Sequence, residues 1–292
     1  MNSSRKTYVR KYLFDWVSLV ITGAVILGIN FIHPYERNFS VTDKTIQYPH
    51  KSDTVPFWAA VMICYIFPLL VVIGLTMFRK GRKDWFAMHT GILALTATQA
   101  ANQLFTNTIK NLAGRPRPDF ISRCAPSVQA INSANGFGSS NNANLVRDPV
   151  FGLFTTSICT AKRDSVFYDG MRSFFSGHSS TAFAGMTFLS LFLAANMKIY
   201  NRKAYTQRAL VTTLPILVAG LIAVSRVSDY RHHWQDVLTG SIVGAAIAYF
   251  FYYIYYPKLH SEKPNAPFRD RIDDIDMFSV ENNDQLRMST DP

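Results

Sequence analysis

Three short segments of the chain combine histidines with fixed positive charges. They are Lys110–Pro118, Phe175–Ser179 and Ser225–Asp236. Lys110, Arg117 and Arg226 supply cationic hydrogen-bond donors of the kind that bind the oxygens of a phosphoryl group. Three separated cations suit an anion with several charged oxygens better than a single cation does. The residue types therefore predict a site for a phosphorylated ligand.

The two histidines of these segments occupy positions that suit different roles. His178 follows Gly177 where an apolar helix is expected to begin, so the free N–H groups of that helix would point at a bound anion. His232 and Asp236 are four residues apart, and a helix beginning there would place the carboxylate beside the imidazole. That contact would fix the tautomer and leave the other ring nitrogen free to attack. We expect one histidine to act as nucleophile and the other as general acid.

Each of these features also has an ordinary structural explanation. A histidine at a membrane boundary is usually a surface or packing residue, and a His–Asp pair at this spacing often only stabilises a helix. Arginines beside an apolar segment often meet lipid headgroups. The joint occurrence of all three features at one predicted face favours catalysis. The sequence shows no carboxylate cluster with metal-ligand spacing, so we expect no metal cofactor.

Apolar segments of about 20 residues would position these groups, since a membrane-spanning helix needs about that length. The six segments are Phe14–Ile32, Val55–Phe78, Trp85–Ile109, Ser180–Ile199, Ala209–Val224 and Trp234–Tyr256. A soluble helical protein is the alternative, but it fits poorly with six such segments separated by basic clusters. We predict an all-α integral membrane protein with six transmembrane helices and a long extracytoplasmic loop between the third and the fourth.

The charge of the chain is distributed as in a membrane protein. The net charge is +11, yet 48% of the residues are hydrophobic, and the bases lie in short clusters between apolar segments. A nucleic-acid-binding protein would gather its bases on one face or tail, so no nucleic-acid partner is expected. The N-terminal segment and the loops 79–84 and 197–208 carry four bases each, more than the loops 33–54 and 226–233. This bias predicts that both termini are cytoplasmic.

Other patterns refine this picture. Gln99, Gln103, Thr106 and Lys110 share one face of the third span, which predicts a bundle interior or a wet cavity beside them. Gly240 and Gly244 in the sixth span are spaced for close helix packing. The expected division is a cytoplasmic N-terminus (1–13), a membrane core (14–256) and a disordered, acidic cytoplasmic tail (257–292).

The cysteines of the long loop bear on its location. Cys124 and Cys159 would form a disulfide if the loop is extracytoplasmic, and would otherwise be two free thiols. The sequence leaves the choice of vacuole, Golgi or plasma membrane open, and it predicts no oligomeric state.

The three segments together resemble a known signature. K-x6-R-P at Lys110–Pro118, S-G-H at 176–178 and S-R-x5-H-x3-D at Ser225–Asp236 are similar to the motifs of the type 2 phosphatidic acid phosphatase (PAP2) superfamily. The first loop, from Pro34 to Pro49, resembles its lipid phosphate phosphatase branch. The tail and the paired cysteines look closest to fungal diacylglycerol pyrophosphate phosphatases.

The resemblance implies a role for each motif residue. Lys110, Arg117 and Arg226 would bind the phosphate oxygens, and Ser176 and Gly177 would line the pocket. His178 would protonate the leaving oxygen, His232 would form a phosphohistidine, and Asp236 would orient His232. Arg115, Asp119 and Arg123 extend the basic loop and are candidates for supporting contacts.

The function that the resemblance implies is magnesium-independent hydrolysis of diacylglycerol pyrophosphate, phosphatidate and lysophosphatidate. The expected partners are thus membrane lipid phosphates within the lipid bilayer. An isoprenoid diphosphate, such as dolichyl or farnesyl diphosphate, would suit the same charges. A non-enzymatic lipid-binding or transport protein is the third alternative, although such a protein would be expected to lose one of the two histidines.

Overall fold

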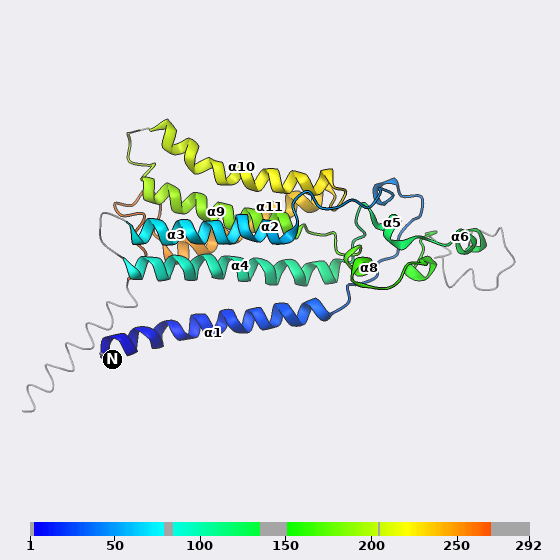
Figure 1. Cartoon of the computed structure of the whole chain (residues 1–292), viewed down its shortest axis with the longest axis horizontal. Coiled ribbons are helices and arrows are strands. Elements are labelled where there is room, and N and C mark those ends of the chain that lie inside the picture. The colour runs from blue at the N-terminus through cyan, green and yellow to red at the C-terminus, as the bar shows by residue number, and fades with distance from the viewer. Residues whose placement is uncertain (1–2, 79–83, 135–150, 204, 270–292) are drawn as a thin grey trace, which may run out of the picture.

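The computed structural model describes residues 3–78, 84–134, 151–203 and 205–269, and within these ranges it contains helices and no strand (Figure 1). The long helices run side by side as a bundle, and short helices gather at one end of it. Among the described residues, five helical segments are long and apolar enough to cross a membrane: Lys11–Phe31, Phe57–Met77, Gly177–Met197, Thr206–Ser228 and Trp234–Tyr255. The chain is therefore an all-α, multi-pass membrane protein.

These segments correspond to five of the six expected spans. The first is most of α1 (Ser3–Phe31). The second consists of α2 (Phe57–Val61), the π-helical turn η2 (Met62–Ile66) and α3 (Phe67–Met77). The others are α9 (Gly177–Met197), α10 (Thr206–Ser228) and α11 (Trp234–Tyr255). The fifth segment is longer than expected, since Pro215 lies within α10 without ending it.

The remaining long helix, α4 (Trp85–Ala113), is as long as α1 but contains no stretch as apolar as those of the five segments. Thr, Gln and Asn side chains are spread along it, and several of them are buried. α4 packs against α1, α3, α9 and α11, so its buried polar side chains lie between helices inside the bundle. Asp84 caps its N-terminus by accepting a hydrogen bond from the backbone N–H of Ala87.

α9 lies at the centre of the bundle, in contact with α4, α10, α11 and the α2–η2–α3 segment. Its approach to α11 depends on glycine. A Cβ atom on Gly244 would lie 2.2 Å from the backbone oxygen of Ser180, and one on Gly240 would lie 2.6 Å from that of Ser176. The close packing expected from the Gly240–Gly244 spacing is thus present, and it joins α11 to the first turns of α9.

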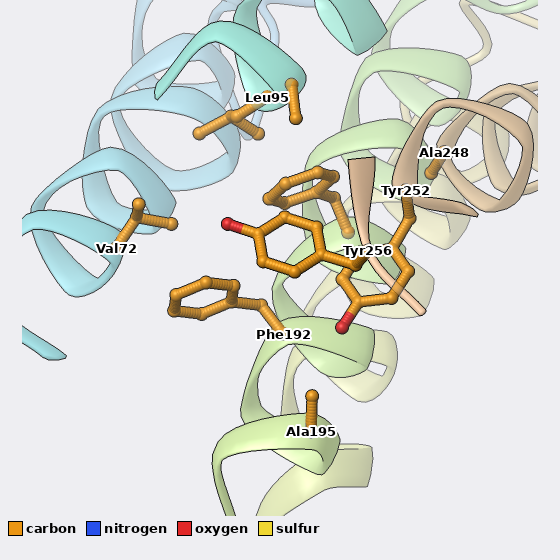
Figure 2. Close-up of a cluster of buried hydrophobic side chains, with 9 residues drawn as sticks. Val72, Leu95, Phe192, Ala195, Ala248, Tyr252 and Tyr256 are labelled. Carbon is orange, nitrogen blue, oxygen red and sulfur yellow. The ribbon is translucent and has the colours of Figure 1, made fainter. Parts of the chain in front are cut away.

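Aromatic side chains fill the half of the bundle that is far from the first turns of α9. Phe188 and Phe192 of α9 pack against Tyr252 of α11 and Tyr256 directly after it, together with small and aliphatic residues of α3 and α4 (Figure 2). This apolar core lies towards the ends of α9 and α11 that are far from His178. It fixes the helices while leaving their opposite ends for polar groups.

A second layer of short elements covers the polar end of the bundle. It contains α5 (Phe120–Cys124), α6 (Val128–Ala134), η4 (Thr156–Ile158) and α8 (Ser165–Asp169) from the loop after α4, and η1 (Lys44–Ile46) from the first loop. The two loops share an apolar cluster, in which Phe39 of the first loop is bridged to Phe154 of the second.

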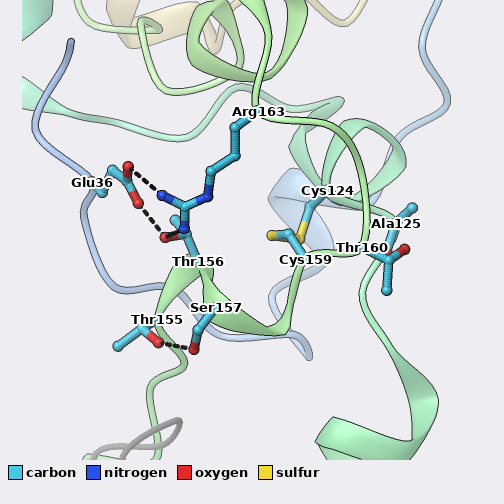
Figure 3. Close-up of a disulfide and its surroundings, with 9 residues drawn as sticks. All are labelled: Glu36, Cys124, Ala125, Thr155, Thr156, Ser157, Cys159, Thr160 and Arg163. Carbon is cyan, nitrogen blue, oxygen red and sulfur yellow. Dashed lines mark hydrogen bonds and ion pairs between the residues drawn. A yellow bond between two sulfur atoms is a disulfide. The ribbon is translucent and has the colours of Figure 1, made fainter.

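The disulfide between Cys124 and Cys159 adjoins that cluster (Figure 3). Beside it, Arg163 forms an ion pair with Glu36 of the first loop and donates a hydrogen bond to Thr156. These contacts tie the long loop to the first loop.

The segment after α11 corrects the expected start of the disordered tail at residue 257. The backbone N–H of Phe268 donates to the carbonyl of Tyr255, and Pro264 and Asn265 are buried. Residues 257–269 therefore lie against the bundle, where Leu259 packs against the apolar core. The rest of the expected tail, 270–292, lies outside the described residues.

Candidate active site

The first site segment begins where α4 ends. Gly114 closes the helix in the left-handed conformation (φ +53°), and a Cβ atom there would lie 2.0 Å from the backbone oxygen of Tyr35. Only glycine suits both conditions. The prolines on either side of Arg117 keep the following chain out of a helix. Lys110 is thereby left in the last turn of α4, with Arg117 buried just beyond it.

The second segment forms the N-terminus of α9. Ser176 is the N-cap residue, and its hydroxyl oxygen accepts hydrogen bonds from the backbone N–H and the hydroxyl of Ser179. A Cβ atom on Gly177 would lie 3.3 Å from Nζ of Lys110, so the ammonium lies against the glycine. Ser176 is thus a capping residue here, while Gly177 allows Lys110 to approach the start of the helix that carries His178.

His232 is buried, and its ring makes one hydrogen bond. Nδ1 lies 2.8 Å from the carbonyl oxygen of Ser173, which can only accept, so Nδ1 carries the proton and donates. Nε2 is therefore the nitrogen with a free lone pair. This is the tautomer that a nucleophilic imidazole needs.

The direct contact expected between His232 and Asp236 is not formed. α11 begins at Trp234, with His233 as its N-cap residue, so His232 precedes the helix and helical spacing does not apply to it. Asp236 instead accepts hydrogen bonds from the backbone N–H and Nδ1 of His233. It also accepts from Oγ of Ser173 and from Nη1 of Arg115, each at 2.6 Å.

Asp236 is nevertheless linked to His232 through one residue. Ser173 donates its hydroxyl proton to Asp236 and accepts from His232 with its backbone carbonyl. The backbone N–H of Ser176 donates to the carbonyl of Asp236, which joins the starts of α9 and α11. The carboxylate of Asp236 thus positions Ser173, and the carbonyl of Ser173 positions the imidazole of His232.

The two arginines of the motifs are held by carboxylates. Nη2 of Arg117 lies 2.6 Å from Oδ1 of Asp169, the last residue of α8. Arg226 donates to Asp229 at 2.8 Å and to Asp53 of the first loop at 3.1 Å. Both guanidinium groups are buried and fixed, and each keeps N–H groups that these carboxylates do not use.

The site has a strongly positive interior. Burial and then the charges of Arg117 and Lys110 lower the pKa of His232 well below its ordinary value. Burial, opposed by Asp169, lowers the pKa of Arg117 to about 10. Burial alone would raise the pKa of Asp169, but Arg117 and Arg123 outweigh it and hold that pKa below its usual range. His232 is therefore neutral, whereas both members of the Arg117–Asp169 pair are charged near neutral pH.

Several donors around the histidines have no hydrogen-bond partner within the described part of the chain. They are Nε of Arg117, Nζ of Lys110 and the buried Nε2 atom of His178. Buried polar groups are normally paired, because leaving one unpaired costs about 1–3 kcal/mol. Lys110 and Arg117 act electrostatically on both His178 and His232, so these four groups lie in the same part of the molecule. An anion with several oxygens suits that arrangement.

Sequence reasoning missed Ser173, Asp169 and the carboxylates that hold Arg226. Ser173, Asp169 and Asp53 belong to no motif, and each acts through a contact between segments far apart in the chain. Asp229 lies within the third segment, three residues after Arg226. Asp119 and Arg123, expected as supporting residues, form a buried ion pair at 2.9 Å, and His50 of the first loop lies 2.7 Å from the same carboxylate. The acidic side chains of Asp53, Asp169 and Asp229 could have suggested partners for the motif arginines, but nothing in the sequence distinguished Ser173.

The comparisons with known proteins agree with the motifs. The pattern of the PAP2 superfamily matches residues 91–259, which contain all three segments. The chain belongs to the PAP2 superfamily. Lipid phosphate phosphatase 2 of Arabidopsis thaliana is 34% identical over 254 residues, which cover 86% of this chain and 79% of the relative. No solved structure is significantly similar to the chain.

Two fungal relatives are similar at the same level. Diacylglycerol pyrophosphate phosphatase 1 of Saccharomyces cerevisiae is 33% identical, over 89% of this chain and 85% of the relative. A probable diacylglycerol pyrophosphate phosphatase 1 of Schizosaccharomyces pombe is 36% identical, over 77% of this chain and 74% of the relative. The chain is thus a PAP2 phosphatase of the lipid phosphate phosphatase branch.

Proposed function

We propose that this PAP2 phosphatase hydrolyses diacylglycerol pyrophosphate, phosphatidate and lysophosphatidate through a phosphohistidine intermediate without a metal ion. The observation that carries the proposal is His232, whose Nδ1 donates to Ser173 and whose Nε2 is free beside Lys110 and Arg117. The names of the fungal relatives support the choice of diacylglycerol pyrophosphate.

The reaction has two steps. Nε2 of His232 attacks the phosphorus atom, a P–N bond forms, and the P–O bond to the lipid breaks while His178 donates a proton to the leaving oxygen. Water then attacks the phosphorus atom of the phosphohistidine and His178 takes a proton from that water. A P–O bond forms, the P–N bond breaks, and inorganic phosphate leaves the regenerated His232. Lys110, Arg117 and Arg226 stabilise the charge on the phosphoryl oxygens in both steps.

Asp236 has a positioning role in this scheme. It holds Ser173 and Arg115, and the Ser173 carbonyl holds the His232 ring. Ser176 contributes by capping α9, and Gly177 contributes by leaving room for the ammonium group of Lys110.

The topology that we propose has six spans, with α4 as the third, and with both termini in the cytoplasm. α4 has the length of a span and lies between α1 and the central helix α9. The loop from Gly114 to Ser176 and the active site would then lie on the non-cytoplasmic side. The bias of bases towards the opposite loops supports this orientation.

The test is phosphate release from diacylglycerol pyrophosphate and phosphatidate in detergent micelles containing EDTA. We expect EDTA-resistant release by the wild type and a loss of at least about 1,000-fold in His232→Ala, because the nucleophile is removed. His260→Ala, which changes an exposed histidine after α11, is the matched control and should keep wild-type activity.

Two outcomes would contradict the proposal. Full activity in His232→Ala would exclude the phosphohistidine mechanism. A wild type that releases phosphate from neither lipid would exclude the proposed substrates and would direct attention to isoprenoid diphosphates.

A further inference from the structure

A pocket of about 430 Å³ lies among α1, α2, η2, α4 and α9, on the bundle side of the active site. α4 forms one wall with Gln99, Gln103 and Asn107, which are spaced by one helical turn each. Ile26 and Val61 belong to the apolar part of the lining, from α1 and α2. The pocket therefore has an amide-rich wall from α4, while the other helices contribute apolar side chains together with the polar Asn30, Tyr65 and Thr181.

The pocket adjoins the catalytic histidine. Phe57 lines it, and the same ring makes an edge contact with the ring of His178, with centroids 5.4 Å apart. Thr181, another lining residue, follows His178 by one turn of α9. Asn107 precedes Lys110 by one turn of α4, about 4.5 Å along the helix axis, and Gln103 lies about 10 Å below Lys110.

The amides of this wall are not all used within the protein. Gln103 donates to the hydroxyl of Thr181 at 2.9 Å, and Gln99 donates to the backbone oxygens of Thr181 and Cys64. Asn107 has no hydrogen-bond partner among the described residues, and Oε1 of Gln99 is buried without one. Burying a polar group at membrane depth costs free energy unless the group is hydrogen-bonded. We therefore expect the free N–H groups of Asn107 to bind an acceptor.

We propose that Asn107 recognises an acyl ester carbonyl of a glycerolipid whose phosphate is bound at His178 and His232. In a phosphatidate the ester carbonyls follow the phosphate after the short glycerol unit, which matches the one-turn step from Lys110 to Asn107. The acyl chains then continue along Ile26 and Val61. This inference rests on the proposed function and names the part of the substrate that the enzyme distinguishes.

The same geometry distinguishes glycerolipids from isoprenoid phosphates. An isoprenoid chain has no carbonyl, so its binding would bury the Asn107 amide without a partner. A site built to hydrogen-bond a substrate group rejects an analogue that lacks the group.

The test compares two substrates that differ only at the proposed contact. One is a diacyl phosphatidate, and the other is a dialkylglycerol phosphate of equal chain length, which has ether oxygens and no carbonyls. In mixed micelles we expect the wild type to have a kcat/KM about tenfold higher for the diacyl lipid. Asn107→Leu should reduce that ratio to about one.

Two further variants make the comparison specific. Asn107→Asp keeps the size of the side chain and removes the N–H donor, so it should also lose the preference, even if the leucine variant does not fold. Asn111→Leu removes an amide from the next turn of α4 that bonds to Ile29 and does not line the pocket, so its ratio should equal that of the wild type.

The outcomes separate this inference from the proposed function. Equal wild-type rates on the diacyl and dialkyl lipids, or an unchanged ratio in both Asn107 variants, would overturn the role of Asn107 while leaving lipid phosphate hydrolysis intact. No hydrolysis of either lipid by the wild type would instead overturn the proposed function.

Discussion

At the scale of single residues, the protonation of His232 follows from its surroundings. The Ser173 carbonyl accepts from Nδ1, and burial beside Arg117 and Lys110 opposes a positive charge on the ring. The imidazole therefore stays neutral, with its lone pair available at Nε2. In the proposed mechanism, the same cations that would bind phosphate thus keep the nucleophile unprotonated.

This arrangement has a consequence for pH dependence. Because the pKa of His232 is lowered in the folded protein, its ring should remain neutral as the pH falls through about 6.5, the ordinary value for histidine. The unfolded chain binds that proton first, so the contribution of His232 to stability falls below that pH. Ring 15N shifts, assigned by comparison with His232→Gln, should show no protonation between pH 7 and 5.5. Titration of this ring near pH 6.5 in the folded protein would contradict the argument.

Asp169 gives a second test at this scale. It forms ion pairs with Arg117 at 2.6 Å and with Arg123 at 3.0 Å, so Asp169→Asn should free the Arg117 guanidinium and lower kcat/KM for phosphatidate by about 10- to 100-fold. Asp169→Glu should restore part of the loss, since it keeps the charge. Glu36→Gln is the control, because it removes a carboxylate whose partner Arg163 is exposed. Equal losses in the asparagine and glutamate variants would argue against positioning by charge.

At the scale of the elements, the starts of α9 and α11 must lie close together to join the motifs. Gly240 and Gly244 permit this contact, and the hydrogen bond from Ser176 to the carbonyl of Asp236 fastens it. α4 meets the same helices and delivers Lys110 to the junction. The geometry of the candidate active site is therefore a property of how three helices pack.

Gly244→Ala should disturb that packing. Its Cβ atom would lie 2.2 Å from the backbone oxygen of Ser180, so α11 must move away from α9. We expect a loss of about 1–3 kcal/mol in the free energy of unfolding and a lower kcat. Thermal unfolding in detergent measures the first and phosphate release the second. Gly220→Ala in α10, where a Cβ atom meets nothing within 4 Å, should not be destabilised; similar losses in both variants would refute the packing argument.

At the scale of the whole molecule, the bundle of long apolar helices carries a layer of short elements at its polar end. The first loop and the long loop share one apolar cluster and a network of charged residues that reaches Arg226 through Asp53. The Cys124–Cys159 disulfide closes a 35-residue separation within the long loop. The described parts of the loop that carries Arg117 and Ser173 are thus folded against the rest of the enzyme.

Loss of the disulfide should therefore destabilise this layer of short elements. In the chain-entropy view, a crosslink over this separation contributes roughly 3–4 kcal/mol. The variant with both Cys124→Ser and Cys159→Ser should unfold at a lower temperature than the wild type. Adding reductant should lower the melting temperature of the wild type and leave that of the double variant unchanged. An equal response of both proteins to reductant would show that the disulfide does not stabilise the fold.

The sequence by itself determined the helical membrane fold, the family and the residues of the three motifs. Apolar length and periodicity depend on local composition, and motif spacing is read along the chain. The tertiary structure decided which groups meet. It placed His232 before α11 instead of within it, assigned Asp236 to Ser173 and Arg115, and brought Asp169 to Arg117. These contacts join distant segments, and their geometry arises only when the helices and both loops pack together.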